Sequence, residues 1–168
     1  ESGDSALLSK SLHRVGGLYS SQQQFEKALE YHERSLAINL GMKFDPAISA
    51  NYINIGNCYQ GMKEYEKALL FFDKSLKIKQ KLKDKRGIGR CLNNAGLVRL
   101  EQGFIEEARE AFLEARAIFD TIGSAQLIAL ATINLGFTAF AEEDYETAVR
   151  HLEMGIYMAD TLQAPYLV

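Results

Sequence analysis

The residues with the most specific chemistry in this sequence are three asparagines at regular spacing. Asn54, Asn94 and Asn134 follow one another at a constant step along the chain. A side-chain amide both donates and accepts a hydrogen bond, so it can pair with either backbone group of an extended peptide. The series predicts a ladder that contacts the backbone of a bound peptide. The alternative is that the amides bond to a neighbouring helix and hold the repeating units together.

Apolar side chains join these asparagines in the C-terminal half of the chain. Leu97 and Leu100 follow Asn94, whereas the matching positions near the N-terminus are largely polar. One hydrogen bond adds only about 0.5 to 1.5 kcal/mol net, so apolar burial must supply most of the binding free energy. We expect the apolar half to anchor a partner, unless another segment of the parent protein folds over it. The candidate groove residues are Asn54, Asn57, Arg90, Asn93, Asn94, Leu97, Leu100, Leu130, Ile133, Asn134, Phe137 and Phe140.

Basic residues are scattered along the same segments. As a minor hypothesis, a few of them bind an acidic side chain or a C-terminal carboxylate of a partner, although their irregular spacing fits such a clamp poorly. These residues are Lys10, His13, Arg14 and Arg90. The basic run over residues 74–90 lacks aromatic side chains at stacking positions. We therefore interpret it as solvated surface and not as a nucleic-acid site.

The composition is that of an ordinary globular protein and excludes several classes of function. The 168 residues carry a formal net charge of -3, which is too small to indicate binding to nucleic acid or to a membrane surface. No run approaches the roughly 18 consecutive apolar residues of a membrane span. Cys58 and Cys91 stand far apart, so we interpret them as reduced core residues and expect a cytoplasmic location.

No pattern in the sequence indicates catalysis or a bound metal. His13, His32 and His151 lack partners at metal-binding spacing, and no phosphate-binding loop or nucleophile motif is present. We therefore expect neither enzyme activity nor a cofactor. His32 stands where Phe72 and Phe112 stand in later units. This position predicts a buried core histidine whose protonation softens the first unit at low pH.

The whole chain repeats with a period of about 40 residues, as several independent series of residues show. The series are Gly16, Gly56, Gly96 and Gly136; Ala28, Ala68, Ala108 and Ala148; Phe25, Tyr65, Ile105 and Tyr145; His32, Phe72, Phe112 and Leu152; and Ser35, Ser75, Ala115 and Gly155. The last series keeps a small residue where two helices must approach closely. A single glycine series can arise by chance, but five series in phase indicate a repeat array.

Each unit contains two helices joined by a short break. Apolar residues fall at helical spacing on both sides of a polar segment, as at 52–59 and 65–76. Asp45 is placed to accept hydrogen bonds from first-turn amides, and Pro46 to occupy the first helical position. The predicted repeats are 5–44, 45–84, 85–124 and 125–164, and Pro165 opens a fifth repeat at 165–168.

Two short motifs resemble the tetratricopeptide repeat. They are Gly-x-x-Tyr, at 16–19 and 56–59, and Tyr-Glu-Lys-Ala at 65–68. The usual unit has about 34 residues, so each unit here is longer and is similar to those of LGN-type scaffolds, kinesin light chains and bacterial signalling proteins. Arg99 and Ala139 depart from the motif by replacing its tyrosine. The resemblance implies an all-α fold, a right-handed α-solenoid of four helix-turn-helix repeats with about eight antiparallel helices.

The resemblance also implies that the first helix of each pair lines a concave groove, and that groove asparagines contact the ligand. We therefore expect a protein-protein interaction module that binds a peptide segment of a partner, as a regulatory or scaffolding fragment of a larger protein. Two alternatives stay open: a sensor segment of a bacterial signalling protein that responds to a peptide effector, and an oligomerisation spacer. Neither nucleic acid nor membrane is expected as a partner, whereas self-association through an uncapped C-terminal repeat is.

Overall fold

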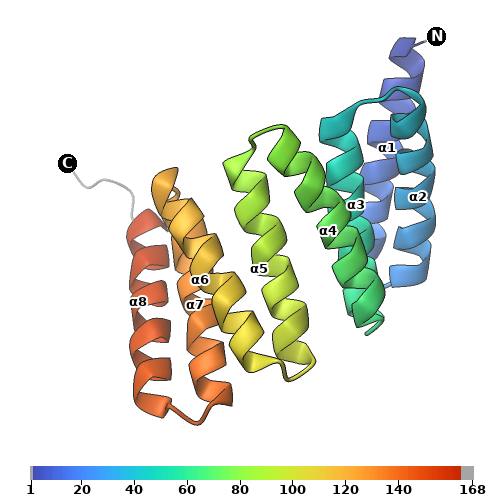
Figure 1. Ribbon diagram of the computed structural model, residues 1–168. Coiled ribbons are helices and arrows are strands. Elements are labelled where there is room, and N and C mark those ends of the chain that lie inside the picture. Colours follow the sequence, from blue (N-terminus) through green and yellow to red (C-terminus); the bar gives the residue numbers. More distant parts are fainter. Residues whose placement is uncertain (1, 164–168) are drawn as a thin grey trace. The chain divides into compact units, whose positions relative to one another are not determined.

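The computed structural model describes residues 2–163, and within this range the regular structure is eight α-helices and no strand (Figure 1). The prediction of an all-α fold with about eight helices is confirmed. The predicted fifth repeat at 165–168 lies outside the described residues. The helices are α1 (Ser2–Ser21), α2 (Phe25–Gly41), α3 (Asp45–Gly61), α4 (Tyr65–Lys81), α5 (Lys85–Glu101), α6 (Ile105–Thr121), α7 (Ala125–Ala141) and α8 (Tyr145–Gln163).

The helix lengths explain the period of the repeat. Helices α2 to α7 have 17 residues each, and a short turn of constant length separates every helix from the next. The middle residue of each turn has a positive φ, which reverses the chain within this short distance. These residues are Gln23, Lys43, Lys63, Lys83, Gly103, Gly123 and Glu143. One helix and one turn therefore make half of a period, and a helix pair with its turns makes the whole.

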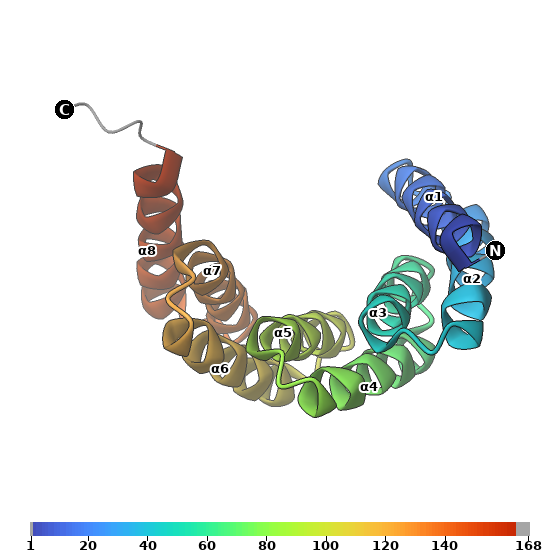
Figure 2. The same cartoon turned by 90° about the horizontal axis from the view of Figure 1, so that it is seen from above.

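The chain divides into two compact units, residues 1–83 with α1 to α4 and residues 84–168 with α5 to α8. In the first unit α2 packs on both α1 and α3, and α1 also contacts α3. In the second unit α6 packs on α5 and α7, and α5 contacts α7. Figure 2 shows the same two-layer arrangement within each unit, in which the first helices of the pairs form one layer and the second helices the other.

A glycine in the first helix of each pair lies directly under a bulky side chain of the second helix. A Cβ added to Gly56 would lie 2.5 Å from the Phe72 ring, and one added to Gly96 would lie 2.7 Å from Phe112. Gly16 with His32 and Gly136 with Leu152 make the same contact, at 2.7 and 2.8 Å. Two of the residue series in the sequence are thus the two sides of one repeated contact, which we call the glycine seam.

The series of small residues marks a second close approach within each pair, near the other end of the helices. Ser35 Oγ donates to the carbonyl oxygen of Ser9 at 3.0 Å, and Ser75 Oγ donates to that of Ser49 at 2.9 Å. At the equivalent place in the last pair, a Cβ on Gly155 would meet a backbone oxygen at 3.3 Å. The predicted close approach is confirmed at Ser35, Ser75 and Gly155.

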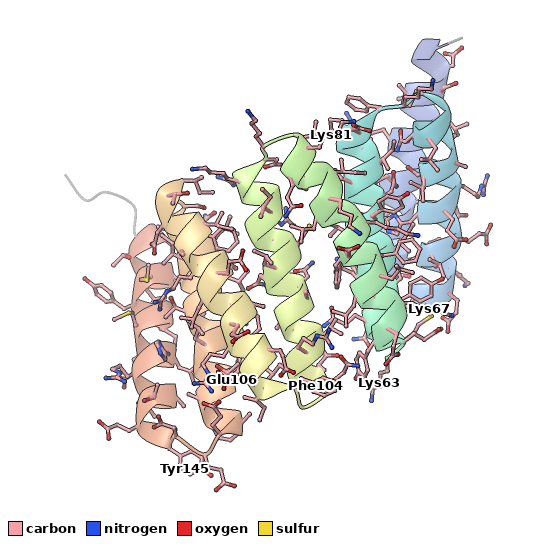
Figure 3. The ribbon with its side chains drawn as sticks, viewed as in Figure 1. Lys63, Lys67, Lys81, Phe104, Glu106 and Tyr145 are labelled. Atoms are coloured by element: carbon pink, nitrogen blue, oxygen red, sulfur yellow. The ribbon has the colours of Figure 1, made fainter. Side chains whose placement is uncertain are left out.

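The prediction that Asp45 caps α3 is wrong. The helix already includes Asp45, and Phe44 is the capping residue, without a side-chain hydrogen bond to the first amides. The Asp45 carboxylate instead accepts a hydrogen bond from Lys81 Nζ at 2.8 Å. Lys81 lies at the end of α4 (Figure 3). An aspartate inside the first turn points along the helix side, so a neighbouring cation competes successfully for it.

Replacing Ala108 by Leu tests the register of these contacts. Ala108 is fully buried in a cluster with Phe112 and Leu135. The larger side chain overpacks this cluster and destabilises the protein by about 1 to 3 kcal/mol, as measured by denaturant unfolding. Ala117→Leu on the exposed side of the same helix is the control and leaves the stability nearly unchanged. Equal stability of the two variants would contradict the packing described above.

Candidate functional site

The predicted groove residues lie on first helices, but only some of them face solvent. The exposed ones are Asn57, Arg90, Leu130, Phe137 and Phe140; the half-buried ones are Asn54, Asn94, Leu97, Leu100 and Ile133; the buried ones are Asn93 and Asn134. Those on α5 and α7 belong to the second unit, and those on α3 to the first.

Two of the repeated asparagines bond to the neighbouring first helix. In the second unit Asn134 Nδ2 donates to Asn93 Oδ1 at 2.8 Å, and both residues are buried. In the first unit Asn54 Nδ2 lies 3.2 Å from His13 Nε2. The positions match, because His13 and Asn93 are two periods apart in the sequence, as are Asn54 and Asn134. These are the inter-helix bonds that the sequence left open as the alternative to peptide contact. The backbone ladder stays a prediction.

Two of the predicted apolar anchors take part in the core of the second unit. Leu97 and Leu100 are partly buried and pack against the cluster of Ala108, Phe112 and Leu135. The sequence grouped these leucines with Phe137 and Phe140 because they share repeat positions, but the structure gives them a different environment.

Ile133 is also drawn into the packing of its own helix pair. A Cβ added to Gly155 of α8 would lie 2.4 Å from Ile133 Cγ1, so Ile133 fills the space above that glycine. Ile133 is therefore only half-exposed, and other residues of α7 form the exposed surface of that helix.

The most exposed apolar surface on a first helix of the second unit is formed by three residues of α7, which we call the α7 stripe. Leu130, Phe137 and Phe140 are 42%, 48% and 60% exposed. Their spacing places them on one side of the helix, while buried α7 residues such as Ala131 and Leu135 pack in the core clusters of the unit. The Phe140 ring also meets the ring of Tyr145 edge-on, with centroids 5.7 Å apart.

Tyr145 lies at the start of α8, beside the turn from α7 (Figure 3), and is 57% exposed. The apolar surface therefore continues from the α7 stripe onto the turn. Large exposed apolar surfaces on a folded protein indicate an interaction site or a covered interface.

The two histidines of the first pair are in contact and are held in the neutral form. His32 is fully buried under the glycine seam, and its ring meets His13 edge-on with centroids 5.3 Å apart. Burial lowers the pKa of His32 to about 4, with His13 as a second cause. Burial also lowers the pKa of His13, which suits its contact with Asn54, because an unprotonated Nε2 accepts the amide hydrogen. The prediction of a core histidine at position 32 is confirmed.

The described residues also contain two buried cysteines, Cys58 and Cys91. Burial raises the pKa of the Cys58 thiol, which disfavours the reactive thiolate. Among residues 2–163 no group of three His, Cys, Asp or Glu side chains is arranged to hold a metal ion. Within the same range, no helix is both long and apolar enough to cross a membrane.

The basic run makes contacts on its own surface. Lys77 Nζ pairs with Asp73 at 2.6 Å, and Lys74 Nζ lies 4.6 Å from the centre of the Phe71 ring. Lys81 bonds to Asp45, as described above. These contacts agree with the interpretation of the run as solvated surface.

Four helix pairs with a repeated glycine seam define an α-solenoid of short helical repeats. The chain belongs to the tetratricopeptide repeat family, whose model matches residues 7–81, 45–121 and 87–160. No curated protein matches the sequence.

Solved structures share the fold at low sequence identity. A Rap protein complexed with Competence and Sporulation Factor is 22% identical, with a TM-score of 0.85 over 92% of this chain. The Rap conjugation gene regulator of plasmid pLS20, in complex with the Phr* peptide, is 18% identical, with a TM-score of 0.84 over 94%. The chain covers 43% of each of these two proteins. A putative kinesin light chain from Podosopora anserina is 18% identical, with a TM-score of 0.73. The match covers 94% of this chain and 77% of the kinesin light chain.

The lowered pKa of His32 predicts that the protein loses stability in mild acid. The unfolded chain binds a proton near pH 6.5 and the folded chain only near pH 4, so the stability is complete above pH 6.5 and falls as the pH drops toward 4. The loss from His32 reaches at most about 3 kcal/mol. His32→Phe, which copies positions 72 and 112, should flatten this dependence in urea unfolding at pH 7.5, 5.5 and 4.5. An equal slope for both proteins would exclude His32 as the cause.

Proposed function

We propose that this chain is a protein-interaction module that binds a peptide segment of a partner, with the α7 stripe as its main anchor. The observation that carries the proposal is the exposure of Leu130, Phe137 and Phe140. Burying about 200 Å² of partner surface against these side chains would contribute on the order of 5 kcal/mol before ordering costs. That is enough to dominate the few hydrogen bonds available nearby.

The repeat itself does not require apolar residues at these positions. In α3 the equivalents of Phe137 and Phe140 are Asn57 and Gln60, and the equivalent of Leu130 is Ala50. All helices α2 to α7 have the same length, so the fold tolerates polar side chains at the positions of Phe137 and Phe140 and a small one at that of Leu130. In α5 the equivalent residues, Leu97 and Leu100, pack against a core cluster, whereas Phe137 and Phe140 are exposed. A binding role explains why large apolar side chains are exposed on α7.

The family supports a protein or peptide as the ligand, and one structural neighbour is in complex with a peptide. Exposed Arg90 and half-buried Asn94, both on α5, are the polar residues of the second unit that we assign to the same surface. A binding module needs no cofactor, and we propose neither catalysis nor nucleic-acid binding. The sensor alternative shares the same ligand class and differs only in the domains of the parent protein.

Selection of peptides from a displayed random library tests the proposal, with purified protein as bait. Selected peptides should carry an aromatic or large aliphatic residue, and Phe137→Glu or Leu130→Glu should weaken their binding at least tenfold in a fluorescence titration. The matched control is Leu113→Glu, since Leu113 is 44% exposed on the second helix α6, compared with 42% for Leu130. Circular dichroism verifies that each variant is folded.

Equal losses for Leu113→Glu and Leu130→Glu would contradict a site on the first-helix layer. Peptides that bind all variants alike would exclude the α7 stripe as the anchor.

Self-association, also expected from the sequence, is favoured by the outer side of α8. Val149 and Ile156 are 53% and 56% exposed. Their equivalents in α6, Arg109 and Arg116, are half-buried, and Arg109 pairs with Glu142 just after α7. We propose that a second copy covers this side of α8.

Sedimentation velocity over a range of concentrations tests this proposal. Val149→Glu with Ile156→Glu should reduce the association, whereas Met154→Glu should not, because Met154 is 52% exposed on the opposite side of the helix. A wild-type protein that stays monomeric up to several hundred micromolar would overturn it.

A further inference from the structure

The first unit contains a pocket of about 350 Å³ between α1, the end of α2 and the start of α3. Its apolar wall includes Met42, Ala47 and Ala50. Lys10 and His13 of α1 also line it, and Lys10 is exposed. The volume lies at the lower end of the range of ligand pockets, roughly 300 to 1,000 Å³, and suits one large side chain better than a cofactor.

The floor of the pocket is held rigid by a chain of buried hydrogen bonds. Ser9 Oγ donates to Asn39 Oδ1 at 2.8 Å, and Asn39 Nδ2 donates to Asn51 Oδ1 at 2.6 Å. Asn51 Nδ2 donates in turn to the carbonyl oxygen of His32 at 3.4 Å. These bonds tie the two amide side chains to each other and to the backbone, so neither is available to fill the space above them. The pocket is therefore preformed.

The second unit shows what fills the same place when the polar residues are absent. Two periods later in the sequence, Asn39 is replaced by Phe119, Asn51 by Ala131 and Ser9 by Gly89. Phe119 is fully buried against Ala131, and a Cβ on Gly89 would lie 2.4 Å from its ring. The second unit thus fills the space with its own aromatic ring.

The pocket wall changes in the same sense. Leu127 of the second unit stands where the first unit has Ala47, and it packs against the cluster that contains Phe119. Compared with the second unit, the first lacks apolar bulk in the floor and at position 47, although Phe44 of the wall stands where the second unit has Ser124. The fold itself thereby identifies an aromatic or large aliphatic side chain as the group that fits.

We propose that this pocket binds one phenylalanine- or leucine-sized side chain of a partner peptide, next to an acidic residue of the same peptide. The inference rests on the proposed function and adds a second anchor to it, in the first unit. The acidic neighbour follows from charge: Lys10 lines the pocket, and no Asp or Glu does so among the described residues. A lysine side chain beside the pocket attracts a carboxylate and repels a cation.

Methyl NMR with blocked dipeptides tests the proposal on the intact chain. The probe is N-acetyl-Asp-Phe-amide, whose blocked end removes the terminal carboxylate. The controls are N-acetyl-Asp-Ala-amide and N-acetyl-Lys-Phe-amide. Saturable shifts of the Met42, Ala47 and Ala50 methyl signals are expected with the first peptide, and at least fivefold weaker binding with the other two. Exposed Ala117 serves as the reference methyl group.

Two variants address the site directly. Ala47→Leu copies Leu127 and should abolish the shifts by filling the pocket. Lys10→Glu leaves the pocket open but should reverse the preference, so that the Lys-Phe peptide binds better than the Asp-Phe peptide. Circular dichroism and thermal unfolding establish that both variants are folded, and the charge reversal decides the question even if Ala47→Leu unfolds.

The outcomes separate this proposal from the proposed function. Phe137→Glu should leave the shifts at the pocket unchanged. If no methyl of the pocket shifts saturably up to the solubility of the peptide, or if Ala47→Leu binds like wild type, the pocket proposal is overturned while the α7 stripe stays unaffected. Binding of free phenylalanine equal to that of the blocked peptide would overturn the assignment to a peptide.

Discussion

The contact between a glycine of the first helix and a bulky side chain of the second sets the geometry of every helix pair. Because a Cβ at Gly56 or Gly96 would meet the opposing ring at 2.5 to 2.7 Å, the two helices must lie at the distance that only glycine allows. That distance brings the small residues further along the pair into contact, as between Ser9 and Ser35. It also fixes which side of the first helix is left for other contacts.

The first helices of both units then share a polar contact at an equivalent place in the repeat. The second unit uses two side-chain amides, Asn93 and Asn134, which stay uncharged over the whole pH range in which the protein is folded. The first unit uses Asn54 and the imidazole of His13, whose acceptor nitrogen is lost on protonation. The same position therefore gives one unit a pH-independent bond and the other a bond that depends on a neutral histidine next to buried His32.

The two units share a skeleton and differ where side chains are free to vary. In the second unit Phe119 fills the space between the helices, and α7 exposes the apolar side chains of Leu130, Phe137 and Phe140. In the first unit a rigid polar floor with Asn39 and Asn51 leaves a pocket instead. Repetition lets such changes accumulate, because a unit that keeps its glycine seam and turns keeps its fold.

The sequence by itself determined the repeat, the helix pairs and the residues of the glycine seam, because a constant period in glycine, alanine and aromatic residues leaves a signal in every unit. It did not determine which repeated polar or apolar residues face solvent. Asn134 and Leu97 share their patterns with groove positions, yet one is buried against Asn93 and the other packs on a core cluster. The sequence also did not reveal the pocket, because Asn39 and Asn51 are not repeated. The volume of the pocket depends on side chains from three helices. Burial is decided by the size and distance of neighbours in space, and only the tertiary structure supplies those.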